Sequence, residues 1–434
     1  MSLPFTKHTL HNGLDVLLHE DRACPIVAVN LWYHVGSKNE QPGHTGFAHL
    51  FEHLMFEGSQ HHDRGYFQPL QGAGATLNGS TNADRTNYWE VVPANALELA
   101  LWMESDRMGY LLPALTEAKF ANQRDVVLNE RRQNYENRPY GLAPMALLAA
   151  LFPPDHPYHW TTIGEIADLH AVKLDEVHAF FRRYYHPGNA SIAVAGDFDA
   201  EETLALVRAY FEDLDAGEAV APVQAAAALS TDSRIFFEDR VELPRLYLAW
   251  LTPAMFADGD ADLDLGTDLL ANGKTSRLYR RLVFEERIAT DVSAAQNSRE
   301  MAGYAQVTAT AAPGHTLGEL ENVILDELVR LASDGPSDDE MDRGRVQAEA
   351  QFVYRLQTVG GFGGKSDQLN AYNVFLGDPD YFDRDLARYH TVSRQSLQQT
   401  MAKYLDPARR VTLSIVPRGR ASLAAPHSAP TDVS

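Results

Sequence analysis

Apolar residues along the first half of the chain alternate with polar ones, run in short β-branched stretches, or recur at helical spacing. Alternation and β-branched runs are typical of strands, whereas apolar residues three or four positions apart are typical of amphipathic helices. This pattern predicts strands over 14–18, 26–33 and 191–195, helices over 47–56, 94–109, 116–132 and 174–185, and a strand, a turn and a second strand over 75–92. Pro113 is expected to separate two of the helices.

The second half of the chain repeats this order of elements. The clearest match aligns residues 169–197 with 389–419, at an offset near 220. A strand over 241–250 and helices over 317–332 and 344–356 follow the same plan. Two copies of one α+β unit explain the pattern most economically.

Composition marks the borders of the two copies. The segment 214–230 is rich in Ala, Gly and Pro and predicts a linker. The expected fold class is therefore α+β, with homologous domains over 1–213 and 231–420, each a mixed β-sheet with helices packed mainly on one face. Residues 421–434 are rich in Ala, Ser and Pro and are expected to form a disordered tail.

The charge balance narrows the classes of partner. Of 434 residues, 37 are Lys or Arg and 59 are Asp or Glu, which gives a net charge of −22. A protein with this net negative charge repels phosphate backbones, which argues against a protein that binds nucleic acid. The single cysteine, Cys24, excludes a disulfide framework within the chain and a cysteine zinc cluster.

No segment is typical of a membrane protein or a secreted precursor. The first 20 residues lack a basic region followed by an apolar one, and the longest apolar run, 145–152, is too short to cross a bilayer. We expect no membrane span and a protein of the cytoplasm, with the periplasm as the alternative if a signal has been removed.

One helix carries candidate chemistry. His49 and His53 stand four positions apart in the pattern H-x-x-E-H, and Glu52 lies beside them. On a helix both imidazoles can face one cation, and two neutral imidazoles suit Zn²⁺. The adjacent carboxylate can take a proton from water as that water attacks a carbonyl carbon. The alternative is that the two histidines have only a structural role in the helix. The other residues of this helix are mostly apolar, and a Glu buried among them needs a partner, which disfavours this alternative.

A zinc site of this kind needs a third protein ligand and an open position for water. The helix expected over 116–132 offers Glu130, with 76 residues between it and His53.

These residues resemble the signature of the M16 peptidases, the pitrilysin or inverzincin clan, in which a helical glutamate follows H-x-x-E-H after about 76 residues. The likeness covers nearly the whole chain and is nearest to the short-chain branch, which includes mitochondrial processing peptidase and bacterial two-subunit M16B enzymes. Supporting stretches lie at 43–49, 55–59, 78–82, 86–88, 156–158, 164 and 184–187.

The resemblance implies an M16/LuxS-like metallohydrolase fold and a zinc endopeptidase that acts on short or unfolded peptides. By resemblance His49, His53 and Glu130 are the ligands of one Zn²⁺ per chain, and Glu52 is the general base. The family also implies that the strand around Asn78 and Gly79 is a sheet edge facing the metal, where an extended peptide can add by backbone hydrogen bonds.

Two departures from the family pattern stand out. The family often has a second glutamate seven residues before the ligand glutamate, and Gln123 stands there, so that another acid could take over its role near the metal. Active members also carry an Arg and, seven residues on, a Tyr that stabilise the tetrahedral intermediate. The corresponding positions are Val283 and Thr290, which cannot donate in the same way.

The missing pair predicts a second M16B subunit that carries the Arg and Tyr, so that this chain is the metal-bearing subunit of a heteromeric peptidase. Two alternatives are a self-sufficient homodimeric peptidase and a non-catalytic structural subunit. Val283 and Thr290 argue against the former, and the complete set of four site residues argues against the latter.

Other motifs are weaker. The stretches 360–366 and 273–275 lack the first glycine of a phosphate-binding loop, so ATP binding is not expected. The glycine-rich stretch instead predicts a flexible loop or tight turn near the substrate. The loop histidines His61, His62, His156 and His159 could bind metal, but solvated side chains are the simpler interpretation.

Overall fold

The computed structural model describes residues 3–229 and 231–433, which fold into two compact units. The first unit contains the chain up to Asn129, together with Thr162–Val223 and Gln351–Arg384. The second contains Glu130–Thr161, Gln224–Ala350 and the chain from Asp385 onward. Each unit therefore includes residues from both halves of the sequence.

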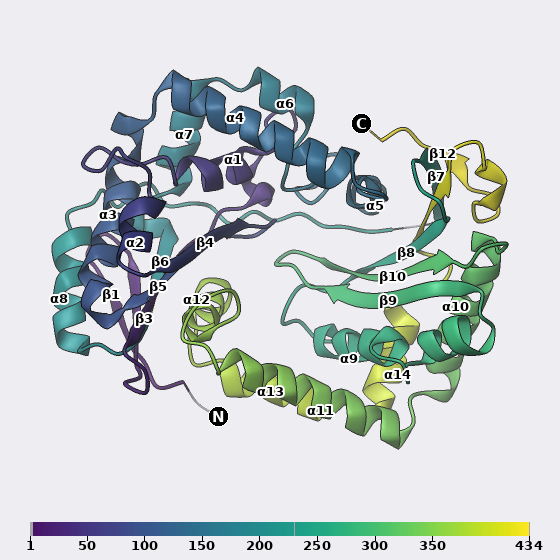
Figure 1. Ribbon diagram of the computed structural model, residues 1–434. Coiled ribbons are helices and arrows are strands. Elements are labelled where there is room, and N and C mark those ends of the chain that lie inside the picture. The colour runs from purple at the N-terminus through teal and green to yellow at the C-terminus, as the bar shows by residue number, and fades with distance from the viewer. Residues whose placement is uncertain (1–2, 230, 434) are drawn as a thin grey trace. The chain divides into compact units, whose positions relative to one another are not determined.

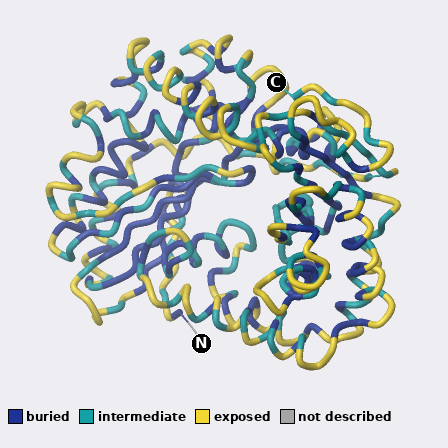
Figure 2. The backbone as a smooth tube through the Cα atoms, turned by 45° about the vertical axis from the view of Figure 1, so that its right-hand side comes forward, coloured by how far each residue is buried: buried dark blue, intermediate teal, exposed yellow. Residues whose placement is uncertain are grey.

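A six-stranded mixed sheet forms the centre of the first unit (Figure 1). Its order is β1-β2-β6-β3-β5-β4, with β2 and β6 parallel and the other neighbours antiparallel. The strands are β1 (Thr6–Thr9), β2 (Asp15–Glu20), β3 (Ile26–Tyr33), β4 (Thr76–Thr81), β5 (Thr86–Pro93) and β6 (Ala190–Gly196). The central strands β3 and β6 are almost wholly buried, as the dark blue backbone in Figure 2 shows.

Helices of the first half cover one face of this sheet. They are α1 (Phe47–Leu54), α2 (Phe67–Gly72), α3 (Leu97–Ala114), α4 (Glu117–Arg131), α6 (Ile166–Ala171), α7 (Leu174–Tyr184) and α8 (Ala200–Phe211), with short 3₁₀ turns at Ser37–Asn39, Ala94–Ala96 and Pro187–Asn189. Helix α7 shows why the face is stable, because Phe180 and Phe181 stack against Phe51 of α1 and Tyr185. Burial of such rings contributes about 1.5–3 kcal/mol each.

The opposite face is covered by α12 (Lys365–Leu376), which comes from the second half of the sequence (Figure 1). Asp367 accepts hydrogen bonds from the side chains of Asn30 at 3.3 Å, Trp32 at 2.9 Å and Asn87 at 3.0 Å. The glycine-rich loop before α12 lies tight on the sheet, because a Cβ on Gly360 would come within 2.5 Å of the Ala28 side chain. This close packing and the positive φ angles of Gly361 (82°) and Gly363 (77°) agree with the tight turn that was one of the two expectations.

The second unit repeats the plan. Its sheet has the order β12-β7-β11-β8-β10-β9, with β7 parallel to both β11 and β12. The strands are β7 (Ser233–Asp239), β8 (Arg245–Thr252), β9 (Ala289–Asn297), β10 (Gly303–Ala311), β11 (Val411–Pro417) and β12 (Ala429–Pro430). The helices are α5 (Ala143–Leu151), α9 (Asp260–Ala271), α10 (Leu317–Asp334), α11 (Asp338–Arg355), α13 (Phe382–Thr391) and α14 (Arg394–Tyr404), with π-helical turns at Arg132–Glu136 and Tyr279–Glu285 and a 3₁₀ turn at Ala421–Leu423.

The two faces of the second sheet differ in character. Leu246, Leu248 and Trp250 of β8 point into the core of this unit, together with Val307 of β10. The alternate residues of the same strands, such as Arg245, stand on the other face. Strand alternation therefore gives this unit one apolar face that packs against helices and one face with polar side chains.

The α+β fold class expected from the sequence is confirmed, because each unit has a mixed sheet with helices packed on it. The repeat is visible in α7 and β6, which match α14 and β11 in order. The domain limits at 213 and 231 remain a prediction. The compact units interleave the two halves, because 351–384 belongs to the first unit.

One local expectation differs from the structure. Residues expected to form a disordered tail include β12, which pairs with β7, and the Pro426 carbonyl accepts a hydrogen bond from Arg234 at 2.8 Å. The break expected at Pro113 is present: Tyr110 leaves helical geometry at φ −132° and kinks α3 before the proline, and α4 begins at Glu117. A proline clashes with the preceding helical turn, which fits a kink at this point. No helix among the described residues is long and apolar enough to cross a membrane.

Candidate metal centre

Helix α1 places the two histidines of the H-x-x-E-H motif. Its first turn is fixed by the buried carboxylate of Glu40, which accepts hydrogen bonds from the backbone N–H groups of Gly46 at 3.0 Å and Ala48 at 2.9 Å. A carboxylate at this end of a helix satisfies unpaired N–H groups and suits the helix dipole. The His49 and His53 rings lie edge to face, with centroids 4.9 Å apart. The sequence spacing thus puts both imidazoles on one face of α1.

Glu130 reaches the same place from α4. One ligand atom from each of His49, His53 and Glu130 lies within 4.8 Å of the others, and all three side chains are half-buried. The border between the two compact units falls within α4, between Asn129 and Glu130. The continuous helix therefore fixes the position of Glu130. No other group of three or more His, Cys, Asp or Glu side chains in the described parts of the chain could hold a metal ion.

Asn134 supports the third side chain of this group. Its Nδ2 donates a hydrogen bond of 3.2 Å to Oε1 of Glu130, one turn away. An amide that holds one carboxylate oxygen leaves the other oxygen to a cation, and such outer partners orient metal ligands. The sequence analysis did not identify Asn134, although its position four residues after Glu130 is the signal that could have found it.

Glu52 stands on α1 beside the two histidines and is half-buried. Its negative charge acts on Tyr185 and Tyr88, whose phenol pKa values are raised first by burial and further by this carboxylate. The pKa of Arg85 is lowered by its burial, while the nearby charges of Asp367 and Glu52 act in the opposite direction. Glu52 therefore lies in a region of low solvent access, where its charge is felt by several side chains.

Gln123, which stands where the family often has a glutamate, forms a side-chain hydrogen bond in the structure. The side-chain amide of Gln123, on α4, donates to the carboxylate of Glu57, which follows α1. Glu57 stands four residues after His53 in the chain, so Gln123 is in contact with an acid.

The strand around Asn78 and Gly79 lies at the edge of its sheet. β4 is the last strand in the order and pairs with β5, where Asn78 stands opposite Trp89 and Gly79 opposite Tyr88. A Cβ on Gly79 would lie 3.2 Å from the Phe56 ring, so this glycine lets the end of the histidine helix pack closely on β4. Asn78 is exposed.

The positions that lack the family Arg and Tyr lie in the second unit. Val283 belongs to the π-helical turn and packs against the core. Thr290 is an exposed residue of β9, and its hydroxyl donates to the Asp291 carboxylate at 3.0 Å. Neither side chain supplies the cationic or phenolic donor that a developing oxyanion needs.

The loop histidines that the sequence analysis weighed have local partners. His61 lies 2.5 Å from the buried carboxylate of Asp106, and His159 lies 2.7 Å from the Phe152 carbonyl oxygen. Nδ1 of His156 accepts a hydrogen bond from the backbone N–H of Tyr158 at 3.0 Å. These contacts agree with structural roles, but His156 is buried and not solvated as the sequence analysis expected.

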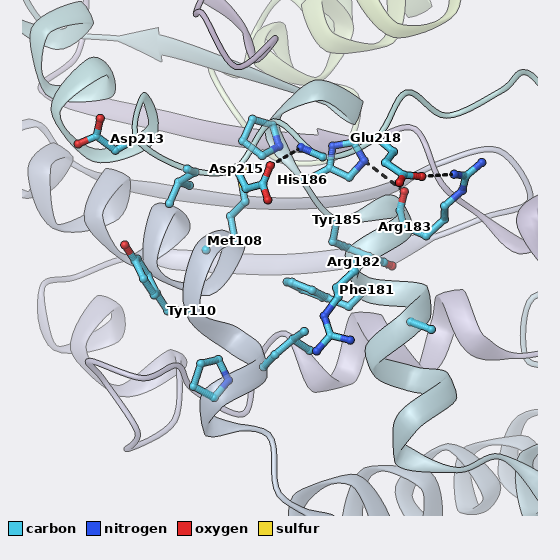
Figure 3. Close-up of a pocket in the computed structure, with 17 residues that line it drawn as sticks. Met108, Tyr110, Phe181, Arg182, Arg183, Tyr185, His186, Asp213, Asp215 and Glu218 are labelled. Atoms are coloured by element: carbon cyan, nitrogen blue, oxygen red, sulfur yellow. Dashed lines mark hydrogen bonds and ion pairs between the residues drawn. The ribbon is translucent and has the colours of Figure 1, made fainter.

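A cavity of about 880 Å³ in the first unit, shown in Figure 3, includes none of the predicted site residues. It lies where the start of the predicted linker packs on the ends of α3 and α7. Arg183 forms an ion pair of 3.3 Å with Glu218 of the linker, and the Leu214 carbonyl accepts a hydrogen bond of 3.1 Å from Asn12. These two contacts anchor the start of the linker to the first unit.

Comparisons with known proteins agree with this geometry. Residues 15–156 match the family model described as Insulinase (Peptidase family M16), and residues 171–347 match the one described as Peptidase M16 inactive domain. The two matches together span most of the chain.

The relatives are similar over most of their length. A zinc protease named PqqE from Helicobacter pylori is 28% identical over 379 residues, which are 86% of this chain and 85% of the relative. An uncharacterised zinc protease from Streptomyces coelicolor is 25% identical over 420 residues, 94% of this chain and 88% of that protein.

Solved structures have the same fold. The crystal structure of a protease from Helicobacter pylori covers 96% of this chain and all (100%) of its own, with a TM-score of 0.88 and 25% identity. A Pseudomonas fluorescens structure described as a peptidase M16 inactive domain has a TM-score of 0.85 at 20% identity, with 99% of this chain and 100% of that one covered. The convergent histidines and glutamate, both family models and these relatives lead to one conclusion: the chain belongs to the M16 metallopeptidase family.

Proposed function

We propose that this chain is the metal-bearing subunit of a zinc endopeptidase that hydrolyses short or unfolded peptides. The observation that carries the proposal is the convergence of His49, His53 and Glu130 within 4.8 Å. Two imidazoles and one carboxylate match the donor set of catalytic zinc sites, which keep a fourth position open. The names of relatives as zinc proteases support zinc over other divalent metals.

The roles of the side chains follow from their chemistry. His49, His53 and Glu130 would hold one Zn²⁺, and Asn134 would keep the Glu130 carboxylate oriented. Bound zinc supplies a Lewis acid that polarises the peptide carbonyl and acidifies the attacking water. Glu52 accepts the proton of that water as the water oxygen bonds to the carbonyl carbon. The same carboxyl group then delivers the proton to the leaving amine.

The edge strand β4 supports a binding mode for the substrate backbone. An extended peptide can add to an open sheet edge through main-chain hydrogen bonds, which depend little on sequence. The close packing of Phe56 against Gly79 ties this edge to the helix that carries the histidines. Asn78 and Gly79 are therefore proposed to contact substrate, and a folded protein is a poor substrate because it offers few free extended segments.

The absence of strong donors at Val283 and Thr290 supports an incomplete transition-state site. A second M16B subunit with an Arg and a Tyr at these positions would supply the oxyanion donors. This chain and the second subunit would then form one heteromeric peptidase.

The test is the Glu52→Gln variant loaded with zinc. The amide keeps the size of the side chain but cannot accept a proton, so peptide hydrolysis should fall about 10²–10⁴-fold. The zinc content should stay equal to that of the wild type, since Glu52 is not a proposed ligand. The conversion Glu98→Gln, on the exposed start of α3, is the matched control and should leave the rate unchanged. A Glu52→Gln enzyme as fast as the wild type would contradict the role of Glu52.

A further inference from the structure

A second cavity, of about 660 Å³, begins at the metal-ligand candidate Glu130 and lies within the second unit. Its wall includes two arginines, Arg138 and Arg245. Neither forms an ion pair with an acidic side chain among the described residues. In a chain of net charge −22, two arginines without an ion pair in one pocket are positive groups that can attract an anion.

Arg245 is held in place by its neighbours. Its guanidinium lies 3.8 Å from the centre of the Tyr140 ring, and its Nε donates a hydrogen bond of 2.8 Å to the hydroxyl of Thr310. The same Thr310 hydroxyl donates a hydrogen bond of 3.2 Å to Asp291, so this acid contacts Arg245 only through the threonine. A stacked and anchored guanidinium loses little freedom when it binds a planar anion.

Tyr140 adopts a conformation that points to a functional constraint. Its backbone φ is 60°, in the left-handed region that a bulky side chain rarely occupies. Two hydrogen bonds maintain it, from its N–H to Asp239 at 2.9 Å and from its hydroxyl to the Leu243 carbonyl at 2.7 Å. The result of this strained backbone is a ring that supports the Arg245 guanidinium inside the pocket.

We propose that this pocket is a subsite that binds a carboxylate of the peptide substrate, with Arg245 as the main contact and Arg138 at the rim. The inference rests on the proposed function, because the proposed zinc ligand Glu130 also lines this pocket. Planar guanidinium groups match carboxylates with paired hydrogen bonds. Asn297 and Gln306 line the same wall. Their amide nitrogens donate to the Tyr304 carbonyl at 3.4 Å and the Thr308 hydroxyl at 2.9 Å, and each nitrogen carries a second N–H for a ligand. The carboxylate belongs either to an acidic side chain or to the C-terminus of the peptide.

The experiment measures binding rather than turnover. Fluorescent peptides are titrated into the zinc-loaded Glu52→Gln chain, and dissociation constants are read from anisotropy. One peptide series carries a single Glu or Gln at successive positions, and a second ends in a free carboxylate or an amide. The charged member of one pair should bind roughly 10- to 100-fold more tightly, as expected for hydrogen bonds to a charged group. The pair that shows the difference identifies the source of the carboxylate.

Matched variants assign the preference to the pocket. Arg245→Met should abolish the difference between the paired peptides, and Arg245→Lys should retain part of it because the charge remains without the planar fork. Arg418→Met, which removes an exposed arginine outside this pocket, should leave the difference intact. Unchanged zinc content in each variant shows that the fold persists.

The possible failures are distinguishable. If peptides bind but the charged and neutral peptides of every pair bind with equal affinity, the proposed carboxylate subsite is contradicted. The proposed function is then unaffected. A preference that survives in both Arg245→Met and Arg138→Met places the carboxylate elsewhere and also overturns the subsite. If no peptide binds to the zinc-loaded chain, the proposed function is contradicted and this inference falls with it.

Discussion

The indole Nε1 of Trp32 donates a hydrogen bond of 2.9 Å to Oδ1 of Asp367, a residue 335 positions later in the chain. Asp367 is buried, and its second oxygen accepts a hydrogen bond of 2.7 Å from the backbone N–H of Gly363. One carboxylate therefore joins the sheet of the first unit to the glycine-rich loop and to α12. This arrangement explains why residues 351–384 belong to the unit that carries the histidine helix.

Replacement of Asp367 by Leu should destabilise the first unit. The change removes the shared acceptor of Asn30, Trp32 and Asn87 and leaves buried donors without a partner, at about 1–3 kcal/mol for each. Hydrogen exchange should increase over residues 360–376, and the denaturation midpoint should fall. Asp367→Asn, which keeps an acceptor oxygen, should lose less. The exposed Asp155→Leu serves as the control, and equal exchange in the Asp367→Leu and control chains would contradict the anchoring role.

The buried Glu90 should make stability depend on pH. Burial raises its pKa well above the ordinary value, and the charge of Glu104 raises it further against the opposing effect of Arg107. The folded protein then holds a proton that the unfolded chain releases above about pH 4.5. The stabilising contribution of this proton is complete below the unfolded pKa and is lost as the pH rises through the folded pKa.

Glu90→Gln isolates that contribution, because glutamine is neutral in both states. The free energy of unfolding of the wild type should decline relative to that of the variant as the pH rises from about 5 to 9. Parallel curves for the two chains over this range would show that the pKa of Glu90 is not raised in the folded state.

Metal analysis tests the ligand set directly. We expect about one zinc per purified chain, because two imidazoles and a carboxylate form a single site. His53→Ala and Glu130→Gln should each reduce the zinc content strongly, whereas His62→Ala, outside the site, should not. Loss of a ligand should lower the affinity by more than the 10- to 100-fold that is typical of outer partners. Full zinc content in both ligand variants would place the metal elsewhere.

The contact between Gln123 and Glu57 predicts the outcome of exchanging the two residues. Gln123→Glu alone replaces a hydrogen bond by two facing carboxylates and should cost about 1 kcal/mol of stability. Adding Glu57→Gln restores one amide and one acid at the contact, so the double variant should recover most of that loss. Denaturation of the four chains measures the coupling. Purely additive losses would mean that the two side chains do not interact in solution.

Local patterns predicted much of this protein. The strand over 26–33 matches β3, and the H-x-x-E-H spacing placed both histidines on one face of α1 because helical periodicity is a property of a few neighbouring residues. The association of Glu130 with them was inferred by family resemblance, since the sequence gives no distance between residues 77 positions apart. The roles of these residues remain proposals that the experiments above address.

What the sequence did not predict depends on long-range contacts. Nothing near Asp367 in the chain indicates that its partners are Asn30, Trp32 and Asn87, because their positions are set by the folded sheet. The short strand β12 likewise exists only because β7 offers it an edge, so Ala and Pro in a weakly patterned tail were interpreted as disorder.

The dependence of activity on a partner is the final prediction. With Val283 and Thr290 in place of strong donors, the isolated chain should hydrolyse peptides slowly. Loss of a single oxyanion donor typically lowers kcat about 10²–10³-fold, so the addition of an M16B subunit that carries the Arg and Tyr should raise kcat by at least that factor.

The assay compares this chain, the partner and their mixture at fixed zinc. The mixture is repeated with a partner in which the Arg is replaced by Met and the Tyr by Phe. Stimulation that needs the intact pair supports the heteromeric peptidase, because assembly alone would persist in the altered partner. Full activity in the isolated chain, with a molecular mass of a dimer, would instead support a homodimer whose donors come from other residues.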